Sequence, residues 1–235
     1  MPSNNFIITS VSTNGDSASL YFDKFVSLDN NLDKKGEKIS RVCTVANSNK
    51  ETAYALPADT SFELDLNSNM IVNHAGGVLE NAGLCLHKFF NYPMIPGSAL
   101  KGITRYYARQ SNLDNETIQR IFGNDDNDND AFCGTVAFLP AIPADRSWEL
   151  TSDILTPHND ETSNPIPIPF IAVKKGATFR FSLKKTSKGS DEDLRLVADL
   201  LKKSLIECGV GAKSASGYGH FKGEPSGTKV KLTLI

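Results

Sequence analysis

The sequence predicts an α+β protein in which helices pack on an antiparallel sheet. Apolar and polar residues alternate with a period of two at 60–66 and at 178–183, as they do in strands with one buried face. Two stretches, 98–109 and 191–208, instead space their apolar residues as amphipathic helices do. The resulting order of strand, helix, strands, helix and strand is that of a ferredoxin-like, RRM-like core with two main helices.

Length and composition are those of an ordinary soluble globular protein. The chain has 235 residues, of which 40% are hydrophobic and 22% charged. We expect a single domain over 1–235, with 1–59 as a helical and irregular N-terminal extension and 60–235 as the core with insertions. No apolar run approaches the roughly 20 residues that span a bilayer, and the polar N-terminus does not resemble a signal peptide. We therefore expect a cytoplasmic protein with no membrane partner.

The four cysteines are scattered through the chain without a CxxC pair. This spacing argues against a zinc site and against a disulfide framework. It favours buried free thiols in a reducing compartment, and we expect no metal and no cofactor.

The N-terminal part is expected to hold one helix and a long loop. A helix is predicted over 18–28 from the near-helical spacing of its apolar residues, whereas 29–52 is rich in Asn, Lys and Asp and is predicted to be irregular. The first core strand begins at Thr60, and a turn follows at Gly76 and Gly77.

The middle of the chain is expected to contain a short helix, an acidic loop and two extended segments. The helix covers 117–122, and strands are predicted at 134–138 and 148–157. The acidic run 124–130 resembles the start of the calcium-binding loop of an EF-hand, but Ala131 and Ala137 stand where that loop needs glycine and glutamate. We therefore expect an exposed acidic loop there.

The last third is expected to hold a hairpin, the second main helix and a final strand. Prolines enforce an extended run over 165–173, and a turn at Gly176 leads into the strand at 178–183 as its hairpin partner. Ser190 is expected to cap the second helix, which Gly209 ends. The final strand is predicted over 230–234.

The central feature of the sequence is the stretch 92–109. A turn at Pro96 and Gly97 is expected to lead into a helix that Ser98 caps. Helical spacing places Leu100, Ile103 and Tyr107 on a face toward the core.

The opposite face of this helix carries Lys101, Arg105 and Arg109 at i, i+4 and i+8. Cations beside the free N–H groups of a helix N-terminus favour an anion, of which phosphate is the obvious one. The alternative is a solvated basic face. Gly102 favours the first interpretation, because a glycine inside a helix costs roughly 1 kcal/mol relative to alanine and is typical of a close approach by another backbone.

A second motif, the glycine-rich segment 209–221, follows the second main helix. It is neither a Walker A loop, since Ala212 precedes the lysine, nor a dinucleotide fingerprint, since Ser214 stands where glycine is needed. Its N–H groups and Lys213 suit a phosphate, and Tyr218 suits stacking on a base. The alternative is a turn that lets the helix pack closely on the sheet.

Charge is unevenly distributed along the chain. Residues 170–235 hold 13 Lys and Arg against 6 Asp and Glu, whereas 1–169 hold 12 against 21, which gives +7 and −9 and the net −2 of the whole chain. A basic C-terminal third is typical of a nucleic-acid footprint, although a solvated surface would look the same.

Together the two motifs resemble those of the RAMP proteins of type III CRISPR effector complexes. Residues 95–105 are similar to the pattern I-P-G-S-S-L-K-G-x-x-R, and 209–219 to G-x-G-x-K-T-x-x-G-Y-G, with Ser214 in place of threonine. Further segments resemble the sixth-subunit RAMP of the Cmr (type III-B) complex: 83–88, 134–143, 153–158 and 165–173. The resemblance covers about 60–222 in the same order.

The resemblance implies a non-catalytic structural subunit that binds CRISPR RNA near its 3′ part and caps or extends a filament of RAMP subunits in antiviral defence. The implied partners are CRISPR RNA, target RNA indirectly, the other Cmr RAMP subunits and the small helical subunit. Target cleavage in that family is assigned to a different subunit. The residues that would contact RNA are Gly97, Ser98, Lys101, Arg105, Gly211, Lys213, Ser214, Gly217, Tyr218 and Gly219.

Two other functions stay open. An endoribonuclease needs a base and an acid beside the scissile phosphate, for which His87, His158, His220 and Tyr218 are candidates. Asp153 is a candidate metal ligand, but nothing else in the sequence completes such a site. A subunit that only contacts other proteins is the third function.

Overall fold

The structure is a computed structural model that describes residues 17–20, 32–48, 50–76, 82–124, 132–155 and 167–223. Its main sheet is built around β6 (Thr178–Lys185), which pairs antiparallel with β1 (Thr60–Asp65) on one side and with β2 (Val136–Phe138) on the other. The short β3 (Ile142–Pro143) also pairs with β6. An isolated bridge from Leu66 to Phe221 places the end of the described chain beside the end of β1.

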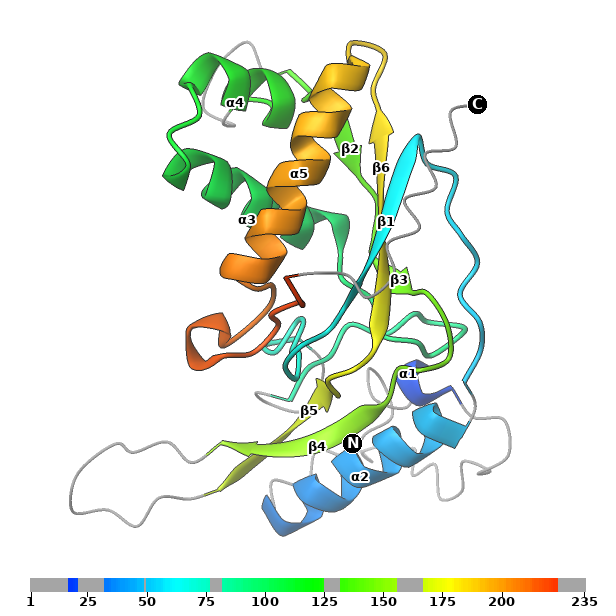
Figure 1. The fold of residues 1–235 in the computed structure, drawn as a ribbon. Coiled ribbons are helices and arrows are strands. Elements are labelled where there is room, and N and C mark those ends of the chain that lie inside the picture. Colours follow the sequence, from blue (N-terminus) through cyan, green and yellow to red (C-terminus); the bar gives the residue numbers. More distant parts are fainter. Residues whose placement is uncertain are drawn as a thin grey trace, which may run out of the picture.

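Two helices cover one face of this sheet (Figure 1). They are α3 (Gly97–Gln110) and α5 (Asp191–Glu207), which pack on each other, and α4 (Asn115–Phe122) lies against α3. The strand order, with Phe221 next to β1, β1 next to β6 and β6 next to β2, is that of the ferredoxin-like arrangement. The predicted fold class is therefore confirmed.

A second layer lies below the main sheet in Figure 1. It consists of the antiparallel ribbon of β4 (Leu150–Leu155) and β5 (Ile168–Val173), with α2 (Leu32–Ser48) packed on it and the short α1 (Ala18–Leu20) beside α2. Both strands were predicted as extended segments. Residues 156–166, which include His158, lie outside the described part of the chain.

Helix α2 corrects the prediction of an irregular loop over 29–52. Ile39, Val42, Cys43 and Ala46 are buried and follow the spacing i, i+3, i+4 and i+7 of a helical stripe. The surrounding polar residues lie on the exposed side and obscured this stripe. Of the helix predicted over 18–28, the described part covers only 18–20, which is helical.

The prediction that β5 and β6 form a hairpin is wrong. β5 pairs with β4 in register from Leu150 opposite Val173, while Phe181 of β6 lies opposite Phe62 of β1. Gly176, at φ 96°, turns the chain from one sheet into the other. The alternation in β6 nevertheless predicted its buried face, because Phe179, Phe181 and Leu183 are all fully buried.

The ends of the helices follow the predicted signals in α4 and α5. Ser190 and Asp193 form a capping box at the start of α5, and Gly123 ends α4, which Asp114 caps through the Thr117 amide. The predicted cap of α3 is wrong: the helix starts at Gly97, its cap residue is Pro96, and no side chain bonds there. The predicted acidic loop from 125, the turn residue Gly77 and the final strand 230–234 lie outside the described residues.

All four cysteines are free, as predicted, but they are not all buried. Cys43 is buried, Cys85 and Cys208 are half-buried, and Cys133 is exposed. Burial raises the pKa of the Cys43 thiol to about 11, so this group is an inert part of the core. No helix in the ranges that the structure describes is long and apolar enough to cross a membrane.

Candidate RNA interface

The first predicted motif lies on α3, whose buried face runs along the helix at steps of four residues. Leu100, Thr104 and Ala108 are buried, and Ile103 and Tyr107 pack at the edge of the core. Gly97 is needed by the fold itself, because a Cβ there would lie 2.1 Å from the Phe138 carbonyl oxygen. The predicted core face is therefore correct in direction but is centred about one residue further round the helix.

Lys101 and Arg105 lie half-buried beside this core face, and Arg109 is exposed. Between the first two stands Gly102, which is exposed, and a Cβ built on it meets nothing within 4 Å. No backbone of the described chain therefore makes the close approach that a glycine inside a helix suggests. Its cost of roughly 1 kcal/mol has no compensation among the described residues.

The second motif forms a tight loop directly after α5. Its centre is a 3₁₀ turn, η2 (Ser214–Ser216), and the Ser216 amide donates to the Lys213 carbonyl oxygen at 2.9 Å. The Ala212 amide donates to the Ile71 carbonyl oxygen at 2.7 Å, and the Val210 amide to that of Gly219 at 2.9 Å. The loop is therefore fixed to the segment after β1 rather than flexible.

The glycines of this loop are required for two different reasons. A Cβ on Gly211 would lie 2.1 Å from the Ile71 carbonyl oxygen, and one on Gly219 would lie 2.0 Å from that of Val210. Both positions are therefore needed for backbone packing. Gly217 meets nothing within 4 Å but has φ 89°, so only its backbone conformation requires glycine.

Lys213 is the residue of this loop that stands out. It adopts the left-handed conformation, at φ 60° and ψ 29°, although it is not a glycine. A long side chain in this region carries strain of about 1–3 kcal/mol, which persists only where the surrounding structure holds it. Hydrogen bonds from the Ser216 and Tyr218 amides to the Lys213 carbonyl oxygen hold it here. No ion pair between described residues involves Lys213.

Tyr218 does not stand free as a stacking platform. Its hydroxyl donates to Asp153 Oδ2 at 2.9 Å, and its half-buried ring meets Phe170 edge-on with the centroids 6.0 Å apart. Burial, and then the Asp153 carboxylate, raise the pKa of Tyr218 to about 12. The sequence suggested Asp153 as a metal ligand, and in the structure it is a hydrogen-bond acceptor for the loop.

Sequence reasoning missed Asn69, which joins these parts. Its Nδ2 donates to Asp153 Oδ2 at 3.2 Å, its Oδ1 accepts from the Lys175 amide at 3.0 Å, and its carbonyl oxygen accepts from the Gly219 amide at 2.8 Å. We call Asn69, Asp153 and Tyr218 the Asn69 node. It connects the loop, the β4–β5 ribbon and the turn before β6, and a single asparagine in a loop carries no signal that would reveal this in the sequence.

The described histidines named as nuclease candidates are used by the fold. His87 Nδ1 accepts from the amides of Phe89 and Phe90, at 3.3 and 3.2 Å. His220 lies between two carbonyl oxygens, with Nδ1 3.2 Å from that of Ile206 and Nε2 3.1 Å from that of Ser214. Within the described ranges, no group of three or more His, Cys, Asp and Glu residues could hold a metal ion.

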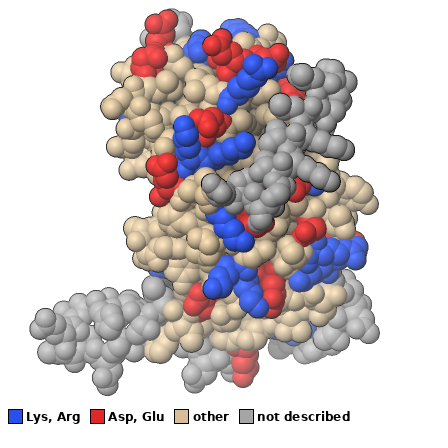
Figure 2. Space-filling view, viewed as in Figure 1, with Lys and Arg blue, Asp and Glu red and all other residues tan. Residues whose placement is uncertain are grey.

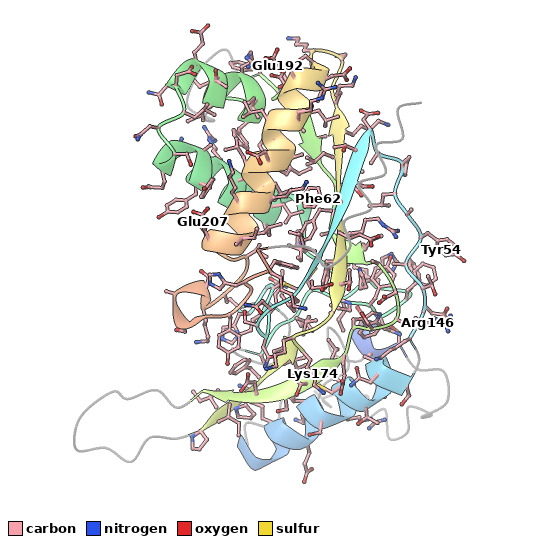
Figure 3. The ribbon with its side chains drawn as sticks, in the orientation of Figure 1. Tyr54, Phe62, Arg146, Lys174, Glu192 and Glu207 are labelled. Atoms are coloured by element: carbon pink, nitrogen blue, oxygen red, sulfur yellow. The ribbon has the colours of Figure 1, made fainter. Side chains whose placement is uncertain are left out.

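The two motifs meet at the C-terminal end of α5. The Tyr107 hydroxyl of α3 donates to Glu207 Oε1 at 3.0 Å, and the glycine-rich loop starts directly after Glu207. Figure 3 shows Glu207 at this end of α5, on the side of α3. The Tyr107 side of α3 therefore contacts the end of α5 at which the loop starts, whereas Gly97 and Ser98 lie more than two turns away along α3.

The described residues form no broad basic surface on the face shown in Figure 2. On the face shown in Figure 2, Lys and Arg side chains lie among Asp and Glu. Several cations of the basic C-terminal third pair with acids from the first 169 residues: Lys174 with Glu149, Arg180 with Glu63 and Lys222 with Asp65. Surface ion pairs between the two parts of the chain therefore neutralise some of the charge asymmetry of the sequence.

Comparison with known proteins identifies the family of this chain. The family model of the RAMP superfamily matches residues 63–222, which include both motifs. CRISPR system CMR subunit Cmr6 of Saccharolobus solfataricus is 27% identical over 155 residues, which cover 63% of this chain and 50% of that protein. The chain thus matches about half the length of this curated relative.

Two solved structures share the fold. A chain of the type III-B Cmr-beta bound to cognate target RNA, solved by cryo-EM, is 24% identical with a TM-score of 0.61, over 92% of this chain and 72% of that one. A chain of the apo state of Cmr-beta is 13% identical with a TM-score of 0.51, over 75% and 98%. Because the family model covers more than half of the sequence and both of its motifs, the chain belongs to the RAMP superfamily.

Proposed function

We propose that this protein is a non-catalytic, CRISPR-RNA-binding subunit of a type III-B effector complex, in which it holds the RNA near its 3′ part and caps or extends the RAMP filament. Its partners are the CRISPR RNA and the neighbouring RAMP subunits, with the small helical subunit and target RNA reached through the assembly. Similarity to Cmr6 and to chains of Cmr-beta supports this assignment.

The observation that carries the proposal is the conformation of Lys213. The loop holds the backbone of Lys213 in a strained left-handed conformation, and strain of this kind is typical of functional sites. Most amides of this loop donate within the protein, so the contact that it offers to a phosphate of a nucleic-acid backbone is the Lys213 cation on a fixed backbone. The ten residues expected to contact RNA remain part of this proposal, with Lys213, Lys101 and Arg105 as its charged members.

The alternative function, an endoribonuclease, is less well supported. The Tyr218 hydroxyl is bound to Asp153 with its pKa raised to about 12, which makes it a poor proton donor near neutral pH. The ring nitrogens of His220 lie against carbonyl oxygens of the fold, so they are poorly placed to act as a base.

RNA binding by purified protein tests the proposal. We expect Lys213→Ala to weaken binding of single-stranded RNA by about tenfold, and to lower the slope of log affinity against log salt by about 0.7, as the loss of one phosphate contact does. Fluorescence anisotropy over a range of salt concentrations measures both. Lys188→Ala is the matched control, because Lys188 is exposed and lies before α5, at the end of that 17-residue helix away from the loop.

A double Lys101→Ala, Arg105→Ala variant separates the three functions. RNA retention falls if the chain binds RNA, cleavage falls if it is a nuclease, and neither changes if it only contacts other proteins. Tagged protein purified from its native cells gives the assembly test. Short RNAs with a uniform, repeat-derived 5′ end and co-purifying RAMP subunits are expected, and a lone protein free of RNA would contradict the proposal.

A further inference from the structure

One histidine of the described chain, His74, is not used by the fold in the way the others are. The ring nitrogens of His87 and His220 face hydrogen-bond partners. His74 Nδ1 is buried and has no hydrogen-bond partner among the described residues, although the residue as a whole is only half-buried. A polar atom left in this state costs about 1–3 kcal/mol and calls for an explanation.

The position of His74 links it to the glycine-rich loop. It follows the segment whose Ile71 carbonyl oxygen accepts from the Ala212 amide of the loop, and its own carbonyl oxygen accepts from the Gly83 amide at 3.0 Å. Its ring meets Phe170 edge-on with the centroids 5.6 Å apart, and Phe170 in turn contacts Tyr218. His74 is thus held on the same support as the loop.

The charges of two lysines from distant parts of the chain act on this imidazole. Burial lowers the pKa of His74, and the positive charges of Lys213 in the loop and of Lys35 on α2 lower it further. The ring is therefore neutral at pH 7 and keeps a lone pair that accepts a hydrogen bond. An anion beside His74 would feel both ammonium groups, and a hydroxyl beside the ring would meet an acceptor.

We propose that His74, Lys35 and Lys213 form a nucleotide subsite next to the glycine-rich loop, in which the lysines bind the phosphate and the imidazole binds the ribose 2′-hydroxyl. This subsite rests on the proposed RNA-binding function and adds to it the recognition of the ribose. The 2′-hydroxyl is the group by which a protein distinguishes RNA from DNA. The subsite also gives a function to α2, which lies outside the ferredoxin-like core.

The test measures sugar preference rather than affinity alone. The probes are a single-stranded uridine oligonucleotide and the same oligonucleotide made of deoxyuridine, each bound to the full chain. His74→Phe keeps a ring against Phe170 but removes both nitrogens. We expect the ratio of RNA to DNA affinity to fall by about three- to tenfold, as the loss of one neutral hydrogen bond does, while affinity for the deoxy probe stays nearly unchanged.

A probe-side experiment does not depend on how the variant folds. Single deoxyuridines placed in turn along the uridine oligonucleotide are expected to reveal one position where wild type loses about three- to tenfold and His74→Phe loses nothing further. Lys35→Gln is expected to lower the salt slope by about 0.7. Arg41→Gln is its control, because Arg41 lies about 120° away from Lys35 around the axis of α2.

The outcomes separate this inference from the proposed function. If wild type binds RNA but shows no sugar preference, or if His74→Phe weakens both probes equally, the subsite is refuted and the proposed function stands. If wild type binds neither probe, alone or in its native complex, the proposed function fails and the subsite fails with it.

Discussion

At the scale of single residues, the best candidates for function are those whose residue type is not explained by the packing of the fold. Gly97, Gly211 and Gly219 are each required by a backbone carbonyl oxygen about 2 Å from where a Cβ would stand. Gly102 is not required in this way, and Lys213 occupies a conformation that a glycine would adopt more easily. The sequence singled out both residues, but only the structure separates them from glycines that serve packing.

Gly102 gives a prediction in which stability and binding change in opposite directions. We expect Gly102→Ala to raise the free energy of unfolding by about 1 kcal/mol, because alanine is the better helix former and a Cβ meets nothing there. RNA affinity is expected to fall if a phosphate backbone approaches this glycine. Urea unfolding and RNA anisotropy on one preparation measure both. Equal RNA affinity in the variant and wild type would show that no ligand approaches Gly102.

Tyr218 gives a prediction about the role of its hydroxyl. Tyr218→Phe keeps the ring against Phe170 but removes the bond to Asp153, so we expect a loss of about 1.5–3 kcal/mol in the free energy of unfolding, as for a hydrogen bond to a charged group. RNA affinity is expected to fall as well, since the loop loses its support. A variant that binds RNA as tightly as wild type would instead indicate that the ring acts by stacking alone.

The raised pKa of Tyr218 also predicts a loss of stability at high pH. The unfolded chain ionises this group near 10.0, the usual pKa of tyrosine, before the folded chain does so at about 12, so the unfolded state binds fewer protons in this window. Stability is therefore expected to fall between these two pH values in wild type. Tyr218→Phe is expected to lose less over the same window in urea unfolding.

At the scale of elements, local signals predicted what local forces determine. The second main helix was predicted with its cap, because Ser190, Asp193 and the apolar stripe are all near one another in sequence. Helix α2 was missed because its burial comes from β4 and β5, more than a hundred residues away. The alternation in β6 indicated which face is buried, but it holds no information about which strand pairs with it, and so the hairpin was wrong.

The Asn47 side chain of α2 hydrogen-bonds to β4 in the way that the backbone of a neighbouring strand does. Asn47 Nδ2 donates to the Leu150 carbonyl oxygen at 2.9 Å, and Asn47 Oδ1 accepts from the Leu150 amide at 2.8 Å. We expect Asn47→Ala to lower the free energy of unfolding by about 1–3 kcal/mol, because both groups of Leu150 lose their partner. An aspartate at this position accepts but does not donate. The midpoint of thermal unfolding of Asn47→Asp is therefore expected to lie between those of wild type and Asn47→Ala.

At the scale of the whole molecule, the fold suggests one RNA surface and the side chains suggest another. RRM proteins bind RNA on the open face of their sheet through aromatic residues. Here that face carries Glu63 paired with Arg180 and Asp65 paired with Lys222, while Phe62, Phe179 and Phe181 point to the core. The RRM-like core therefore predicts the topology, whereas the proposed interface lies at the end of α5 and on the glycine-rich loop.

Arg180 tests this distinction. Its guanidinium bonds to Glu63 Oε1 at 2.8 and 3.0 Å on a partly exposed surface. We expect Arg180→Gln to change the free energy of unfolding by less than about 1 kcal/mol and to leave RNA affinity unchanged. Weaker RNA binding with the fold intact, measured by anisotropy beside Lys213→Ala, would move the interface onto the sheet.

The Asn69 node makes the glycine-rich loop and the β4–β5 ribbon parts of one thermodynamic unit. Tyr218 and Asn69 meet on the same oxygen of Asp153, a residue of β4. A neighbour that grips the ribbon more tightly when these bonds are intact must, by reciprocity, also favour the loop geometry that presents Lys213. Binding of such a partner to the ribbon and binding of RNA to the loop would then be coupled, so the affinity for either one, measured alone, would be lower than its affinity in the complex.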